Sequence, residues 1–75
     1  MRKEFCRKDG YLITYSDEDV CFEERETKDR VLLKNNGEII SSDFDYERNK
    51  FFINYLNQIY QGITTFRNLD AMENA

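Results

Sequence analysis

The spacing of apolar residues along the chain changes near Ser42. Before that point, apolar residues occur in short, roughly alternating runs, which is the period of a half-buried strand. After it, they recur at the three- and four-residue spacing of one helix face, at Phe52, Tyr55, Leu56, Ile59, Tyr60 and Ile63. The sequence therefore predicts an α+β fold, in which a small antiparallel sheet is followed by one C-terminal helix packed on the sheet.

The first part of the chain predicts a four-stranded antiparallel meander. Each expected strand is short, rich in β-branched or aromatic residues, and bounded by polar turn residues. The expected strands are residues 11–16, 20–25, 30–34 and 38–41. Between the last two, Asn36-Gly37 suits the centre of a type I′ hairpin turn, which needs positive φ at both central residues. That turn would place Lys34 opposite Ile39.

The helix is expected over residues 43–61. Ser42 or Asp43 is a suitable N-cap, because a side-chain oxygen there can accept hydrogen bonds from the first free amides. Gly62 is the expected C-terminal stop. Continuation of the helix through Gly62 is the alternative, because Phe66 falls on the same apolar stripe.

The whole chain, residues 1–75, reads as a single small domain. Residues 1–9 form a basic arm with Phe5 as its large apolar anchor, and residues 70–75 are expected to fray. A chain of 75 residues buries only about 60–65% of its unfolded surface, so further stabilisation is needed. Six phenylalanines and five tyrosines are available to supply it through dense packing.

Several classes of protein and site do not fit the composition. The apolar runs are far shorter than the ~20 residues that cross a bilayer, and the basic N-terminus is not followed by a signal-peptide core, so a cytoplasmic protein is expected. In that compartment Cys6 and Cys21 are expected to stay reduced, with a disulfide as the alternative.

Candidate chemistry is sparse. The chain has no histidine, which excludes Ser–His and Cys–His catalysis, and two cysteines alone do not complete a zinc site. The sequence also lacks the spacing of a calcium-binding loop and a glycine-rich phosphate loop. The prediction is a non-enzymatic protein with no cofactor and no metal.

The main electrostatic feature is an acidic cluster within thirteen residues. Its seven members are Asp17, Glu18, Asp19, Glu23, Glu24, Glu26 and Asp29. The cluster is expected to fold into one sheet edge with its two loops and to form a concentrated negative surface on a chain of net charge −4. It is the candidate site for a protein partner that has a basic surface.

Three functions remain open. The first is an inhibitor that docks on a basic nucleic-acid-binding surface of a host protein. Small acidic phage and mobile-element proteins of the anti-CRISPR or anti-restriction type are similar in size, charge and order of elements. No family motif supports that similarity, and acidic loops that only keep the domain soluble are the alternative for the cluster.

The second function is a homo-oligomeric assembly module, possible as a homodimer. The apolar positions of the helix cover roughly 200°, whereas a helix on one sheet needs only about 100°. The surplus edge is either Phe51, or Ile53 with Tyr60. The third function is single-strand nucleic-acid binding, with bases stacked on Tyr11, Tyr15 and Phe22, which the net charge of −4 opposes.

Overall fold

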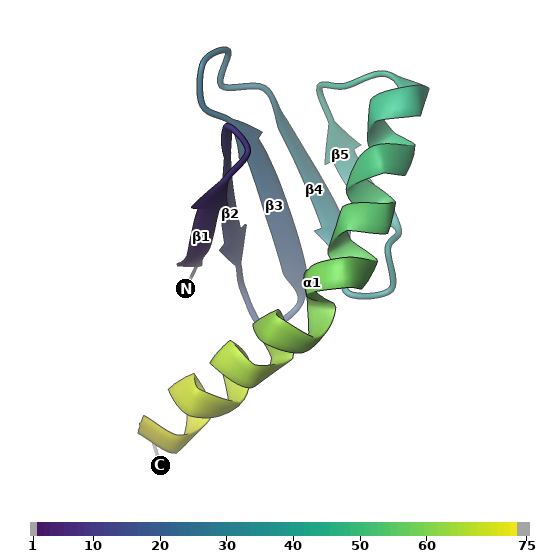
Figure 1. The fold of residues 1–75 in the computed structure, drawn as a ribbon. Helices are drawn as coiled ribbons and strands as arrows, with labels where there is room; N and C mark the ends of the chain where they lie inside the picture. Colours follow the sequence, from purple (N-terminus) through teal and green to yellow (C-terminus); the bar gives the residue numbers. More distant parts are fainter. Residues whose placement is uncertain (1, 74–75) are drawn as a thin grey trace.

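The computed structural model describes residues 2–73 and contains one antiparallel sheet followed by one helix. The five strands pair in chain order, so the sheet is a meander (Figure 1). They are β1 (Lys3–Lys8), β2 (Tyr11–Tyr15), β3 (Asp19–Glu24), β4 (Arg30–Lys34) and β5 (Ile39–Ser42). The α+β class is confirmed, but the expected number of four strands is wrong because the N-terminal segment adds a fifth.

The segment expected to be a basic arm is the edge strand β1. Asp9 and Gly10 both have positive φ, at 55° and 83°, and Lys8 pairs with Tyr11 across them. This is the geometry of a two-residue type I′ hairpin, and Asp-Gly is one of its strongest sequence signals. The register shifts by one residue between Glu4 and Cys6, so a β-bulge interrupts the alternation that would have revealed the strand.

The hairpin between β4 and β5 is confirmed, but its turn type and register are not the expected ones. The amide of Gly37 donates to the carbonyl of Lys34 at 2.9 Å, which places Asn35 and Asn36 at the centre of the turn. Gly37 has a φ of 91°, whereas Asn36 stays outside the positive-φ region. A type I turn followed by a left-handed glycine adds one residue to the loop. Ile39 therefore lies opposite Leu33 and not Lys34.

The helix α1 (Tyr46–Glu73) begins later and ends later than expected. Asp45 is its N-cap, because its Oδ1 accepts from the amide of Arg48 at 2.9 Å. The helix continues through Gly62, as the alternative allowed. Residues 70–73 are helical and not frayed, while Met1, Asn74 and Ala75 lie outside the described residues.

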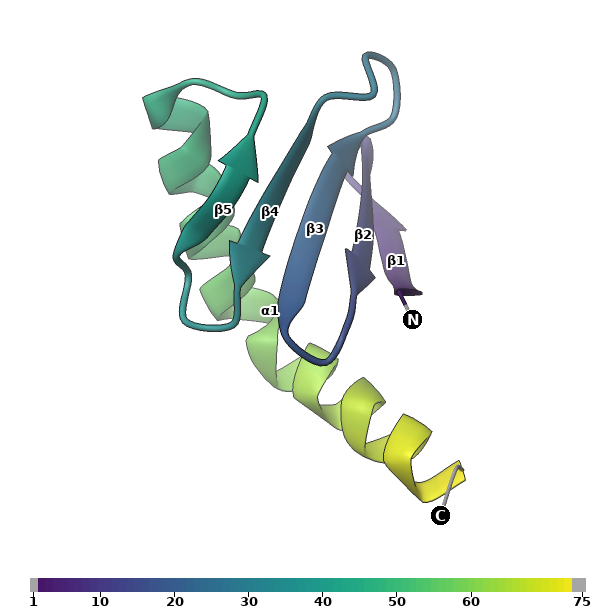
Figure 2. The same cartoon turned by 180° about the vertical axis from the view of Figure 1, so that it is seen from behind.

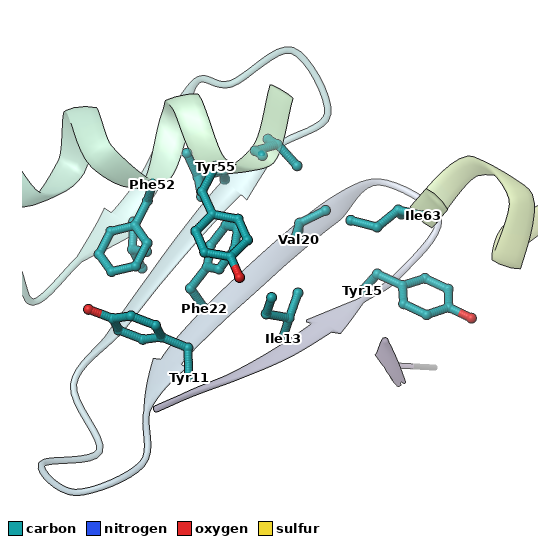
Figure 3. Packing of buried hydrophobic residues seen from close by; sticks show 11 residues of the cluster. Tyr11, Ile13, Tyr15, Val20, Phe22, Phe52, Tyr55 and Ile63 are labelled. Atoms are coloured by element: carbon teal, nitrogen blue, oxygen red, sulfur yellow. The ribbon is translucent and has the colours of Figure 1, made fainter. Parts of the chain in front are cut away.

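The helix crosses one face of the sheet, and its C-terminal half passes beyond the end of the sheet (Figure 1). Figure 3 shows Phe52 and Tyr55 of the helix packed against Phe22 and Tyr11 of the sheet. The ring centroids of Phe22 and Phe52 are 5.2 Å apart. Fully buried aliphatic side chains surround these rings, from Ile13, Val20, Val31, Leu33, Leu56 and Ile63. Aromatic packing between the sheet and the helix thus forms the core of this short chain.

In the part of the chain that the structure describes, the opposite face of the sheet carries no helix (Figure 2). Because side chains alternate along a strand, Cys21 points to this open face, whereas Cys6 packs against the core on the helix side. Both thiols are free, and the sheet separates them, so they cannot pair within the chain. Burial raises the pKa of the Cys21 thiol, which favours its unreactive protonated form.

Within residues 2–73, no helix combines the length and the apolar character needed to cross a membrane.

Candidate protein-binding tip

Two hairpin turns lie side by side where the helix leaves the sheet (Figure 2). One is the β2–β3 turn, residues 16–19, and the other is the β4–β5 turn, residues 34–38. We call these two turns together the acidic tip. The side chain of Asn35 joins them, because its Nδ2 donates to the backbone carbonyl of Asp17 at 3.2 Å.

Ser16 shapes the first turn of the acidic tip. Its backbone amide donates to the carbonyl of Asp19 at 3.0 Å, and its hydroxyl donates to Asp19 Oδ1 at 2.8 Å. The same hydroxyl accepts from the amides of Glu18 and Asp19, at 3.3 Å each. A serine that bonds to the backbone two and three residues ahead is a local turn device, so the conformation of this turn is set by its own sequence.

Arg67 fixes both turns to the helix. Its Nε donates to the carbonyl of Ser16 at 2.8 Å, and its Nη2 donates to the carbonyl of Asp19 at 3.2 Å and to Asn35 Oδ1 at 2.8 Å. The planar guanidinium can satisfy three acceptors from two turns at once, which a lysine cannot do. The acidic tip is therefore held in one arrangement before any partner arrives.

Two carboxylates of the acidic tip point freely into solvent. Asp17 and Glu18 are exposed, and within the described residues neither side chain has an ion pair or a hydrogen bond. Asp19, by contrast, forms an ion pair with Arg2 and accepts from Ser16. The unneutralised negative charge of the tip thus comes from Asp17 and Glu18.

The structure does not gather the seven acidic residues into one surface. The expectation that they lie along one sheet edge is wrong, because β3 is the central strand. Asp17, Glu18 and Asp19 lie at one end of β3, whereas Glu24, Glu26 and Asp29 lie at the other end. Five residue steps of ~3.4 Å separate Asp19 from Glu24, which is about 17 Å.

Of the remaining members of the acidic cluster, only Glu23 has an ion pair within the described residues. Glu23 faces Arg30 across the open face, with Arg30 Nε and Glu23 Oε1 3.9 Å apart. Glu24 accepts from the hydroxyl of Thr27 at 3.3 Å. Glu26 is exposed in the β3–β4 loop, and Asp29 is half-buried there.

Sequence reasoning did not identify Ile40 or Arg67 as parts of the site. Ile40 lies in β5 with 49% of its surface exposed, beside the acidic tip. Ile40 is the extra residue that β5 inserts between the partners of Leu33 and Leu32, so simple alternation along the strand did not reveal its exposed position. Arg67 was missed because the helix was expected to end at residue 61.

The candidate oligomer face is only partly available. Ile53 and Tyr60 are half-buried and pack against the core. Phe51 is 45% exposed, and its ring lies edge-on to Tyr55 with the centroids 5.7 Å apart. The surplus apolar edge of the helix is therefore reduced to Phe51 near the helix start.

The aromatic residues considered for base stacking lie in the core. Tyr11, Tyr15 and Phe22 are all buried on the helix side of the sheet. The open face instead has a hollow of about 510 Å³ over Leu12, Cys21 and Leu32. Among residues 2–73, no aromatic side chain lines that hollow.

Among residues 2–73, no three potential histidine, cysteine or carboxylate ligands come together as a metal site.

No protein-family model matches the chain, and comparisons with curated proteins and with solved structures likewise gave no match.

Proposed function

We propose that this chain is a small, cytoplasmic, non-enzymatic binding protein that docks its acidic tip on a basic surface of another protein. The observation that carries the proposal is the pair of free carboxylates, Asp17 and Glu18, on turns that Arg67 holds in place. A preorganised contact loses less conformational entropy on binding than a mobile loop does. Exposed carboxylates also attract a basic partner from a distance and speed its encounter.

The partner that best matches this chemistry is a protein with a nucleic-acid-binding groove. Such grooves carry clusters of lysine and arginine that neutralise phosphates. A rigid pair of carboxylates can occupy the same positions and block the groove. We therefore propose an inhibitor of the kind that phage and mobile elements direct against host nucleic-acid enzymes, as anti-CRISPR and anti-restriction proteins do.

The test is capture of a partner from bacterial lysate at low and at high salt, with the captured protein identified. The tip variant Asp17→Asn/Glu18→Gln removes the two free charges. The matched control is Glu24→Gln/Glu26→Gln, which removes the same charge at the opposite end of β3. Loss of a basic nucleic-acid-binding protein with the tip variant alone supports the proposal, while equal capture by all three proteins contradicts it.

A homo-oligomeric module is the second candidate, favoured by the exposed aromatic ring of Phe51 near the start of α1. Phe51 is 45% exposed and is a large apolar side chain. A two-fold dimer through this surface would enlarge a small core. Sedimentation equilibrium of the wild type and of Phe51→Ala tests it, because only a dimer that uses this surface becomes weaker in the variant.

A further inference from the structure

The two edge strands of the sheet differ in how they are protected against pairing. The outer strand β1 carries Lys3, Glu4, Arg7 and Lys8, and it contains the bulge between Glu4 and Cys6. Charged side chains and bulges are the usual features that prevent another chain from pairing with a sheet edge. The other outer strand, β5, also has a register shift, at Ile40, but its sequence Ile-Ile-Ser-Ser contains no charged residue.

The β5 edge lies beside the acidic tip. Within the described residues β5 pairs only with β4, so its outer backbone faces no neighbouring strand. In Figure 2 it forms the border of the sheet on the side away from β1, with the first turns of α1 behind it. Ile40 lines a hollow of about 440 Å³ together with Asp17 and Glu18. An exposed aliphatic side chain and two free carboxylates are thus presented next to a strand edge that carries no charged residue of its own.

We infer that the outer edge of β5 receives an extended, basic segment of the partner as an added strand; this inference rests on the proposed function. In strand addition, main-chain hydrogen bonds supply affinity, and alternate side chains of the incoming segment supply specificity. Here an apolar side chain of the incoming strand packs on Ile40, and a lysine or arginine reaches Asp17 or Glu18. The acidic tip is the place where the partner binds, and strand addition is the way in which it binds.

Charge complementarity favours a basic segment over a second copy of this chain. Antiparallel pairing of β5 with itself, centred on the strand, sets Glu38 of one copy opposite Asp43 of the other. Both copies also carry a net charge of −4, so they repel each other. Like charges directly opposite in a strand pair are destabilising. A lysine-rich or arginine-rich segment replaces that repulsion with attraction.

The test uses a capped peptide of alternating lysine and valine as the probe, followed by amide NMR of the full chain. A matched peptide with N-methylated valines keeps every side chain and charge but lacks main-chain donors along one edge. We expect the parent peptide to bind about tenfold more tightly than its N-methylated form. It should also slow hydrogen exchange of amides in residues 39–42.

Two protein variants with the same net charge separate edge pairing from general electrostatics. Ile40→Lys places a charge on the β5 edge, and Asn57→Lys places the same charge on an exposed position of the helix. We expect Ile40→Lys to lose peptide binding and Asn57→Lys to retain it. Equal binding to both variants, or slowed exchange in β1 and not in β5, overturns the inference.

The proposed function and this inference fail in different ways. If both peptides bind equally and Asp17→Asn/Glu18→Gln abolishes both interactions, the acidic tip docks without strand addition, and only the inference is wrong. If the tip variant binds the parent peptide as the wild type does, docking through the acidic tip is itself contradicted.

Discussion

Gly62 of the helix lies directly against the ring of Phe5 in β1. A Cβ atom at position 62 would be 3.0 Å from Phe5 Cζ, which is closer than normal van der Waals contact. The Phe5 ring also packs edge-on against Phe66, with the centroids 4.9 Å apart. Gly62 therefore permits the close approach of the edge strand, and it does so inside a continuous helix.

This contact predicts strong coupling between positions 5 and 62. In an uncrowded helix, glycine to alanine gains about 0.8–1 kcal/mol of stability. We expect Gly62→Ala to lose that gain in the wild-type background, because the Phe5 ring must move, and to recover it in the Phe5→Ala background. Urea unfolding of the wild type, the two single variants and the double variant should give a coupling free energy of about 1 kcal/mol between the two positions. Additive effects of the two substitutions on the free energy of unfolding would contradict the contact.

Arg67→Ala is expected to lower the free energy of unfolding by about 2 kcal/mol, because three acceptors of the acidic tip lose a charged donor. Amide exchange in residues 16–19 and 34–38 should become faster in the same variant. Arg67→Lys should recover only part of the loss, since an ammonium cannot span both turns. Lys50→Ala, an exposed change earlier on the helix, is the control, and an Arg67 effect as small as the Lys50 effect would refute the proposed role.

Tyr55→Phe is expected to stabilise the protein by about 1 kcal/mol. The Tyr55 hydroxyl is buried, and within the described residues it has no hydrogen-bond partner, so its removal relieves a desolvation cost. Tyr15→Phe should have the opposite effect, because the Tyr15 hydroxyl donates to Asp70 Oδ2 at 2.6 Å. Thermal unfolding of both variants measures whether each substitution raises or lowers the stability. A destabilised Tyr55→Phe variant would show that the Tyr55 hydroxyl has a hydrogen-bond partner in solution.

Asp70 is expected to make stability depend on pH in the acid range. The hydrogen bond from Tyr15, followed by the neighbouring Lys3, holds the pKa of Asp70 below its usual value. The unfolded chain therefore takes up this proton at higher pH than the native state does. The stabilisation is complete above the usual carboxyl pKa of about 3.9 and is lost as pH falls through the lower native pKa.

Urea unfolding of the wild type and of Asp70→Asn across that range is the corresponding measurement. The difference in the free energy of unfolding between the two proteins should be constant near neutral pH and should shrink below about pH 4. A difference that stays constant down to the acid limit would mean that Asp70 has an ordinary pKa in the native state.

The extent of the sheet shows what the sequence could predict. Strands in the middle of the chain have clear apolar alternation and were expected within a residue or two of their observed bounds. β1 was missed because an edge strand is charged and its bulge at Phe5 breaks the alternation. Asp9-Gly10 is nevertheless a sequence signal for the hairpin turn that joins β1 to β2.

The helix shows where local preference is overridden by packing. Glycine at position 62 favours a helix end, and propensity alone gives no reason to continue. The continuation is stabilised by contacts that are distant in sequence, from Phe66 to Phe5, from Arg67 to the two turns, and from Asp70 to Tyr15. A local pattern does not contain these contacts.

The candidate site could be predicted only in part. Because the seven acidic residues are close in sequence, one acidic patch was expected. In the structure, the central strand β3 lies between the members at its start and those at its end, so the two groups are a full strand length apart. Which carboxylates of the cluster form ion pairs depends on Arg2 and Arg30, whose positions follow from the complete topology.

The most direct measurement of the central claim is the affinity of a captured partner for the wild type, for Asp17→Asn/Glu18→Gln and for Glu24→Gln/Glu26→Gln, at low and high salt. We expect the tip variant to bind at least about tenfold more weakly at low salt, with association slowed more than dissociation is accelerated. The far-end variant should stay within about threefold of the wild type. Equal losses in the two variants would mean that only net charge matters, and that the acidic tip is not the binding site.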